Sequence, residues 1–164
     1  GVGHMAVKLA VGLGADVTVI SRTADKEADA RMLGAGQFLV TTDEGAMAKR
    51  QADFDLIIDT VPVQHDIVPY VSLLDVDGAL VVVGYFGPLA DADTVPLIFG
   101  RRSITGSSVG SLAETQELLE FCAVKGILPE CEVIRMEQIN HAFERMARSD
   151  VRYRFVIDMS SLAG

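Results

Sequence analysis

The chain begins GVGHMAVKLAVGLGADVTVI, residues Gly1 to Ile20. A Gly-x-Gly turn runs directly into an amphipathic helical segment, Gly14 breaks that segment, and residues 16–20 have the β-branched pattern of a buried strand. A glycine turn, a helix and a strand follow in this order in dinucleotide-binding units, where amides at the helix N-terminus face the pyrophosphate. The stretch therefore predicts a Rossmann-like, doubly wound α/β fold.

The residues after this strand indicate which dinucleotide is bound. The strand ends at Ser21, Arg22 and Thr23, and Lys26 follows one helical turn later. An acid at this point bonds the free ribose 2′-hydroxyl of NAD, whereas basic residues accommodate the 2′-phosphate of NADP. Because no acid stands here and arginine offers a planar fork of donors to phosphate, these residues predict NADP(H). The alternative is a helix N-cap at Thr23 followed by solvated basic residues.

The composition agrees with one α/β domain. The chain has 164 residues, of which 49% are hydrophobic and none is Trp, as is typical of aliphatic parallel sheets. The net charge of −9 argues against a nucleic-acid partner, and no apolar run reaches the length of a membrane span. Two cysteines nine residues apart form no disulfide framework, so a reducing compartment such as the cytoplasm is expected.

Strands and helices alternate along the rest of the chain, which predicts a parallel sheet with helices on both faces. Further strands are expected at 37–40, 54–60, 78–84, 95–99, 103–107, 132–135 and 151–158, with 95–99 and 103–107 at the sheet edge. Helices are expected at 25–33 after a cap at Thr23, from a capping box at Thr41 to about Arg50, at 67–74, from a capping box at Ser111 to Lys125, and around 139–147.

The predicted sheet lacks its central strand. Strands of this fold lie in the order 3-2-1-4-5-6, and the first strand, with the first glycines of the fingerprint, would precede Gly1. We therefore expect a truncated domain in which strands 16–20 and 54–60 present unpaired inner edges. Buried unpaired backbone groups are costly, so a gap or a distorted closure is expected there.

Five blocks of sequence follow one another along nearly the whole chain. They are GVGHMAVK from Gly1, VTVIS from Val17, DTVP from Asp59, SITGS from Ser103 and DVRYRFVID from Asp150. Together they resemble the medium-chain zinc-dependent alcohol dehydrogenases, and within them the cinnamyl-alcohol-dehydrogenase-like branch of NADP-dependent aldehyde reductases. One glycine turn would be weak support, whereas five blocks in the right order are specific.

The resemblance implies a set of cofactor contacts. For the pyrophosphate they are Gly1, Val2, Gly3 and Arg154, and for the nicotinamide and its ribose they are Thr60, Val61, Val83, Gly84, Tyr85, Ser107, Ser108 and Val109. The second set lies at or just beyond the carboxyl ends of expected strands, at the edge where open α/β sheets bind ligands. Without the resemblance, a lone Gly-x-Gly is any tight turn and Arg154 is a surface charge on an edge strand.

The resemblance also implies an enzyme. In the family, the zinc ligands and the proton-relay residues belong to an N-terminal catalytic domain that this sequence does not contain. The substrate is a small alcohol or aldehyde. Zinc in the catalytic domain polarises the carbonyl of the aldehyde, and the nicotinamide cofactor carries the redox chemistry. The chain alone is expected to be inactive and to hold no zinc.

The domain organisation and the assembly follow from the same resemblance. Residues 1–149 would form the dinucleotide-binding domain, and residues 150–164 would form a strand that returns to the catalytic domain. The edge at residues 95–107 carries apolar side chains beside two arginines. Because apolar sheet edges invite pairing with another chain, we expect a homodimer through this edge.

The remaining reactive side chains favour structural roles. Cys122 lies on an apolar helix face and Cys131 in a loop, without the C-x-x-C spacing typical of zinc sites. His4 is expected to pack near the cofactor rather than to act as a base. His65 and His141 are expected at the surface or at helix ends.

Two alternative classes of function remain open. A stand-alone dinucleotide-binding or sensor module without turnover would use the same cofactor residues, and the coding sequence upstream of Gly1 would discriminate it from the enzyme. A methyltransferase-type domain also uses a glycine turn, but it usually has an acid where this chain has Ser21. No Tyr is followed by Lys four positions later, which argues against a short-chain dehydrogenase.

Overall fold

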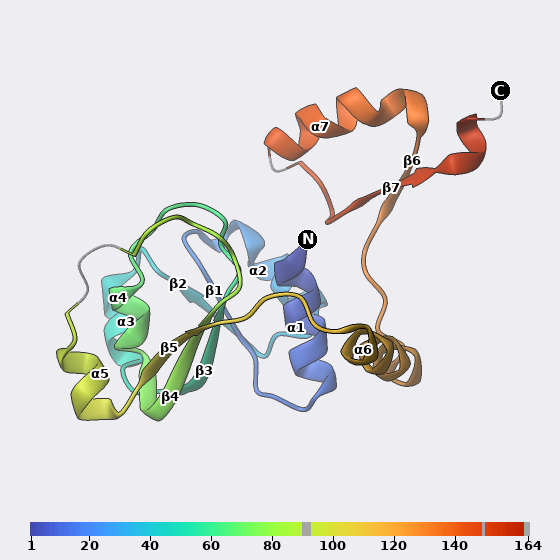
Figure 1. Ribbon diagram of the computed structural model, residues 1–164. Coiled ribbons are helices and arrows are strands. Elements are labelled where there is room, and N and C mark those ends of the chain that lie inside the picture. Colours follow the sequence, from blue (N-terminus) through green and yellow to red (C-terminus); the bar gives the residue numbers. More distant parts are fainter. Residues whose placement is uncertain (90–92, 149, 163–164) are drawn as a thin grey trace.

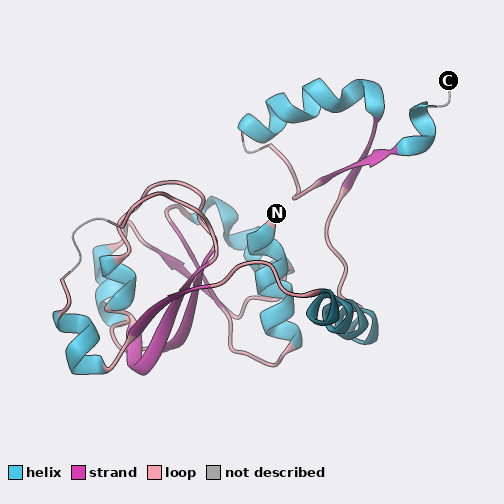
Figure 2. Cartoon of the chain, in the orientation of Figure 1, coloured by secondary structure: helices cyan, strands magenta, loops and turns pink. Residues whose placement is uncertain are grey.

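The computed structural model describes residues 1–89, 93–148 and 150–162, in which helices and strands alternate (Figure 2). In chain order the elements are α1 (Val2–Gly12), β1 (Thr18–Ser21), α2 (Glu27–Met32), β2 (Gln37–Val40), α3 (Glu44–Lys49), β3 (Phe54–Asp59), α4 (Val68–Val71), β4 (Leu74–Val82), α5 (Val95–Gly100), β5 (Ser103–Gly106), α6 (Leu112–Lys125), β6 (Glu132–Arg135), α7 (Ile139–Ala147) and β7 (Phe155–Asp158). Short 3₁₀ turns occupy Ala24–Lys26, Met136–Gln138 and Met159–Leu162.

The strands of the described residues pair in parallel but form three separate sheets. β1 pairs with β2, β4 lies between β3 and β5, and β6 pairs with β7. No backbone ladder joins β1 to β3 in the described part of the chain. The order is therefore the Rossmann-like one with the expected gap between β1 and β3, and the predicted fold class is confirmed.

The hydrophobic core lies on the face of the strands that α3, α4 and α5 cover, whereas α1 lies on the opposite side (Figure 1). Leu73, Leu74 and Leu80 are completely buried there. The same cluster contains Leu39 from β2 and Ile57 from β3. Apolar packing therefore holds together two sheets that share no backbone pairing.

Arg50 provides a polar connection between the same two sheets, near the amino ends of the strands. Its guanidinium donates to Gln37 Oε1 at 2.9 Å and to Thr18 Oγ1 at 3.3 Å, on the β2 and β1 side. It also pairs with Asp53 and lies 4.7 Å above the Phe54 ring, on the β3 side. One side chain thus spans the gap that the backbone leaves open.

The strand expected at 95–99 is wrong, because this segment forms helix α5. Pro96 lies in the first turn, where proline is tolerated and its fixed φ favours a helix. The Asp93 carboxylate accepts from the Val95 amide at 2.9 Å, which supports the start of the helix. Because short apolar runs fit a strand or a helix equally well, sequence alone did not decide it.

The helix expected at 67–74 is also shorter than predicted. Only Val68–Val71 is helical, and β4 begins at Leu74, before the expected start at Gly78. The completely buried Leu73 and Leu74 explain the early end, since they turn into the core.

Of the three predicted helix caps, the one at Thr41 is wrong, the one at Thr23 is correct in position only, and the one at Ser111 is confirmed. The amide of Thr41 continues the strand ladder by donating to Ser21 O at 2.9 Å, so α3 starts later and Asp43 caps it. Thr23 makes no side-chain cap bond, and its hydroxyl donates to Asp25 instead. The capping box at Ser111 is confirmed, with Glu114 as its partner.

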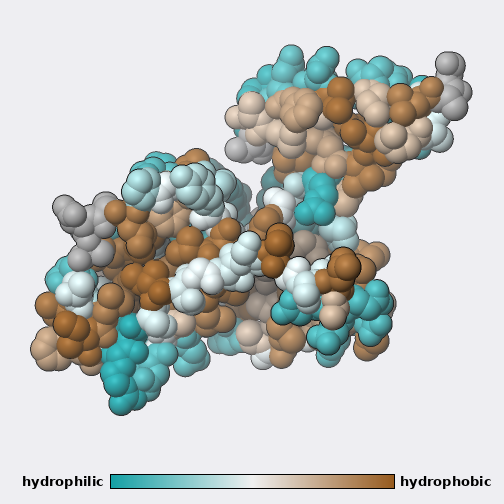
Figure 3. Space-filling model, viewed as in Figure 1, coloured by the Kyte–Doolittle hydropathy of each residue, from teal (hydrophilic) through white to brown (hydrophobic). Residues whose placement is uncertain are grey.

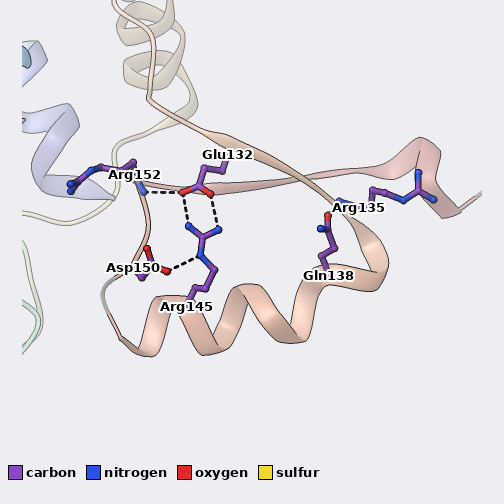
Figure 4. Close-up of polar contacts among 6 residues, drawn as sticks. All are labelled: Glu132, Arg135, Gln138, Arg145, Asp150 and Arg152. Atoms are coloured by element: carbon purple, nitrogen blue, oxygen red, sulfur yellow. Dashed lines mark hydrogen bonds and ion pairs between the residues drawn. The ribbon is translucent and has the colours of Figure 1, made fainter.

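Strands β6 and β7 and helix α7 form a small unit at the upper right of Figure 1. Figure 4 shows what closes it: the Arg145 guanidinium donates to both oxygens of Glu132, at 2.7 and 3.1 Å, and to Asp150 at 3.0 Å. These donors lower the pKa of the Glu132 carboxyl. The last strand thus pairs with β6 inside this unit, while the domain boundary at residue 150 stays a prediction.

None of the described helices is both long and apolar enough to cross a membrane.

Candidate functional site

The carboxyl ends of β3, β4 and β5 lie in one row. The amides of Val83 and Gly84 donate to Asp59 O at 2.9 and 3.1 Å, and the amide of Ser107 donates to Val82 O at 3.1 Å. The backbone pairing therefore continues beyond the last residues of β4 and β5. It brings three separately predicted groups, those after β3, β4 and β5, to the same edge of the sheet.

Gly84 lets two of these strand ends approach each other closely. A Cβ on Gly84 would lie 2.6 Å from Val61 O and 3.0 Å from the carbonyl carbon of Thr60. Both contacts are to backbone, which cannot rotate away as a flexible side chain can. A glycine is therefore required here, and the predicted contacts at Thr60, Val61 and Gly84 form one continuous surface.

The predicted pyrophosphate turn lies beside this row. Gly1 is the N-cap of α1 and makes no side-chain cap bond, so the first amides of the helix have no side-chain partner there. A Cβ on Gly3 would meet the Thr60 hydroxyl at 3.2 Å, which places the turn against the end of β3. Arg154 and Lys26 lie close enough for their charges to act at the Gly1 nitrogen. Two basic side chains from distant parts of the chain thus lie around a helix N-terminus.

The predicted 2′-phosphate group lies at the end of β1. The Thr42 hydroxyl donates to Arg22 O at 3.0 Å, which fixes the loop that leaves this strand. Ser21 is half-buried and Arg22 is exposed. The Thr23 hydroxyl donates to Asp25 Oδ2 at 3.1 Å. The Asp25 carboxylate, which was not among the predicted site residues, therefore competes with a 2′-phosphate for this hydroxyl.

An apolar hollow opens between the ends of β4 and β5. It has a volume of about 280 Å³, and its lining includes Gly84, Tyr85, Phe86, Leu89 and Ile104. Phe86, Leu89 and Ile104 were not predicted as site residues. Phe86 and Leu89 follow β4 and Ile104 lies within β5, so the only sequence signal was their closeness to the predicted edge.

The predicted residues farthest along this edge lie at the surface. Tyr85 is 86% exposed and Val109 is 95% exposed. Ser107, Ser108 and Val109 belong to the exposed segment between β5 and α6. The structure therefore places them near the row of strand ends without enclosing them.

The expectation that His65 is a surface or helix-end residue is wrong. Its Nε2 lies 2.9 Å from Asp59 Oδ2, and its ring packs 4.7 Å from the Phe86 ring. The side chain of Asp59 is itself buried. Sequence reasoning missed this pair, although an acid at the end of an apolar strand, with a His six residues later, was a usable signal.

His4 packs as expected and joins three segments. It is only 5% exposed, and its ring stacks on Tyr153 at 4.7 Å. Its Nδ1 lies 2.5 Å from Gly1 O, and its Nε2 accepts from the Glu130 amide at 3.3 Å. Burial lowers the pKa of its imidazole, so the neutral ring is favoured. His141 is exposed, as predicted.

The described residues do not fit a zinc site. Cys122 is half-buried and Cys131 is exposed, and both are free thiols. Within the described ranges no group of three or more His, Cys, Asp or Glu side chains is placed to hold a metal ion.

A family profile described as "Zinc-binding dehydrogenase" matches residues 1–124. The chain belongs to the zinc-binding dehydrogenase family. The predicted relationship to cinnamyl-alcohol-dehydrogenase-like proteins is confirmed by its relatives. A probable cinnamyl alcohol dehydrogenase of Populus deltoides is 49% identical over 162 residues, which is 98% of this chain and 45% of that relative. The NADP-dependent alcohol dehydrogenase C of Mycobacterium bovis is 48% identical over 99% of this chain and 47% of that relative.

Solved structures of the family agree with the fold. A cinnamyl alcohol dehydrogenase from Sorghum bicolor superposes with a TM-score of 0.88 at 44% identity, covering 96% of this chain and 45% of that one. A CAD from Helicobacter pylori, complexed with NADP(H), gives 0.83 at 32% identity, covering 98% and 46%. The chain thus spans about half the length of the relatives it matches, in their dinucleotide-binding part.

Proposed function

We propose that this chain is the NADP(H)-binding part of an alcohol dehydrogenase or aldehyde reductase, which transfers hydride between NADPH and a small aldehyde. The observation that carries the proposal is that the glycine turn and the ends of β3–β5 meet at one edge, and that Lys26, which follows β1, lies close enough for its charge to act at Gly1. The names of two relatives agree with the cofactor, since one is NADP-dependent and one was solved with NADP(H).

The pyrophosphate fits the start of α1. The amides of Gly1, Val2 and Gly3 would donate to its oxygens, and the helix dipole favours an anion there. Gly3 already lies against Thr60, so a larger residue would push into the strand end. Arg154 and Lys26 would add positive charge around the same turn.

The two ends of the cofactor fit different strand ends. Ser21, Arg22, Thr23 and Lys26 would hold the 2′-phosphate, with Thr23 shared with Asp25. The nicotinamide and its ribose would lie along the edge formed by Thr60, Val61, Val83, Gly84, Tyr85, Ser107, Ser108 and Val109. When bound there, the nicotinamide supplies the hydride. This chain's own residues bind and orient it.

The reaction itself belongs to the whole protein. The described residues offer no ligand set for zinc, so the chain of 164 residues alone should not reduce aldehydes. We place the dinucleotide-binding domain at residues 1–149 and a strand that returns to a catalytic domain at residues 150–164. Cofactor binding without turnover in the intact protein would instead support a non-catalytic dinucleotide-binding module.

A homodimer through residues 95–107 is part of the proposal, with α5 and the edge strand β5 as its contact surface. Ile98 and Phe99 on α5 are 67% and 84% exposed, and Figure 3 shows apolar surface gathered over this helix. We expect the intact protein to be dimeric by light scattering, and Phe99→Glu to shift it toward monomer. A wild-type protein that is monomeric at micromolar concentration would refute this contact.

Cofactor choice tests the proposal directly. A charge-assisted hydrogen bond is worth about 1.5–3 kcal/mol, so Arg22 and Ser21 should favour NADPH over NADH by at least about tenfold. In the intact protein, Ser21→Asp should reverse the ratio of the two dissociation constants, and Arg22→Ala should weaken NADPH more than NADH. Lys49→Ala, at the far end of α3, is the matched loss of a cation and should leave the ratio unchanged. Equal affinities in the wild type would refute the assignment.

A further inference from the structure

Asp59 and His65 form a closed set of contacts around the loop that follows β3. The Asp59 carboxylate accepts from the Val61 amide through Oδ1 at 2.9 Å and faces His65 Nε2 through Oδ2 at 2.9 Å. The other ring nitrogen, Nδ1, lies 2.8 Å from Val63 O. Both ends of the loop, and the amide of Val61 within it, are therefore fixed by two side chains.

The same loop is fastened to the loop that follows β4. The His65 ring packs against Phe86, and the Gln64 amide donates to Pro88 O at 3.0 Å. Asp59 contributes a third link through its carbonyl, which accepts from the amides of Val83 and Gly84. The side chains of Asp59 and His65 are 8% and 19% exposed, so water competes little for these contacts.

We propose that Asp59 and His65 act as a positioning pair that sets the backbone of Thr60 and Val61 against Gly84, and so orients the nicotinamide end of the cofactor. This inference rests on the proposed function and adds two residues to it. Neither residue would touch the reacting atoms. The pair acts through the Val61 amide, and displacements of about 1 Å at a reacting centre can cost about a hundredfold in rate.

Both ring nitrogens of His65 face acceptor oxygens, one on Asp59 and one on the backbone of Val63. Each of these contacts is a hydrogen bond only when the nitrogen that makes it carries a proton. A side chain without N–H donors at this position should therefore release the loop from Asp59 and from Val63.

Two variants of the intact protein and one control test the pair. His65→Phe keeps an aromatic ring against Phe86 but removes both polar contacts, and Asp59→Asn keeps the shape and one acceptor but removes the charge. Loss of one such contact should weaken the binding of NADPH and of NADH equally, by about fivefold, and should lower kcat more than it raises KM. His141→Gln, on the exposed face of α7, is the matched control and should change neither the cofactor affinities nor the kinetic constants.

Rescue by a conservative variant separates positioning from a merely structural role. His65→Gln keeps an N–H donor that can face Asp59 but lacks the ring that packs on Phe86. It should therefore restore cofactor affinity and kcat relative to His65→Phe. Its binding also tests the pair if His65→Phe fails to fold.

Failure of the proposed function and failure of the positioning pair give different results. If neither cofactor binds the wild type, the proposed function fails. If both bind, but His65→Phe or Asp59→Asn binds and turns over as the wild type does, or His65→Gln binds no better than His65→Phe, the positioning pair is overturned.

Discussion

Replacing Gly84 by alanine should damage the site more than its single added methyl suggests. The new Cβ would lie 2.6 Å from Val61 O, about 0.8 Å inside ordinary contact, which begins at 3.4 Å. It would also meet the carbonyl carbons of Val61 and Thr60 at 2.9 and 3.0 Å. The obstacle is backbone, so β3 and β4 must separate at their carboxyl ends.

The cost of this separation can be placed within a range. Overpacking a well-packed position typically costs about 1–3 kcal/mol, and here it also strains the amides of Val83 and Gly84 that bond to Asp59 O. Gly106→Ala is the matched control at the end of β5, because its Cβ would meet only Val82 O, at 3.9 Å. Denaturant unfolding of the intact protein should show a loss of about 1–3 kcal/mol for Gly84→Ala and within about 0.5 kcal/mol of no change for Gly106→Ala.

The cofactor affinity of Gly84→Ala, measured by titration, is a second test of the same contact. A displacement of the Thr60–Val61 backbone should weaken NADPH and NADH together, because both share the nicotinamide end. The reasoning is refuted if Gly84→Ala unfolds at the same free energy as Gly106→Ala and retains wild-type affinity for both cofactors.

Two further predictions concern other parts of the chain. Ser111→Ala removes the hydroxyl that accepts from the Glu114 amide at 3.2 Å, so it should cost about 1 kcal/mol and speed hydrogen exchange in the first turn of α6; unchanged exchange there would contradict the cap. His4 has a pKa lowered by burial, so the unfolded chain binds its proton more readily and stability should fall as the pH drops below about 6.5. Between pH 7.5 and 5 the free energy of unfolding should therefore fall less in His4→Gln than in His141→Gln. Equal losses in the two variants would show that His4 does not contribute to the pH dependence.

Local patterns predicted much of the secondary structure. The strands Gln37–Val40 and Glu132–Arg135 and the helix Leu112–Lys125 have the predicted bounds or nearly so. In each case the signal lies within the element itself, as β-branched residues, a capping box or a glycine C-cap. The errors at residues 95–99 and at 67–74 arose where short apolar segments carry no period long enough to distinguish a helix from a strand.

The candidate site was predicted residue by residue but not as a set of contacts. The glycine turn and the residues after each strand could be named because parallel strands place their carboxyl ends together. The contact of Gly84 with Val61, and the pairing of Asp59 with His65, depend on register and on a loop path that composition does not encode. These site residues stay predictions until cofactor binding is measured.

The sequence by itself determined the fold class, the family and the gap between β1 and β3, because the order of turn, helix and strand and the alternation of apolar segments are local properties. Only the tertiary structure decided that Arg50 and a shared apolar core span that gap, and that β7 pairs with β6. It also decided that His65 turns inward onto Asp59. The physical reason is that each of these contacts joins residues from different elements, and its free energy depends on burial and distance, which exist only once the chain has folded.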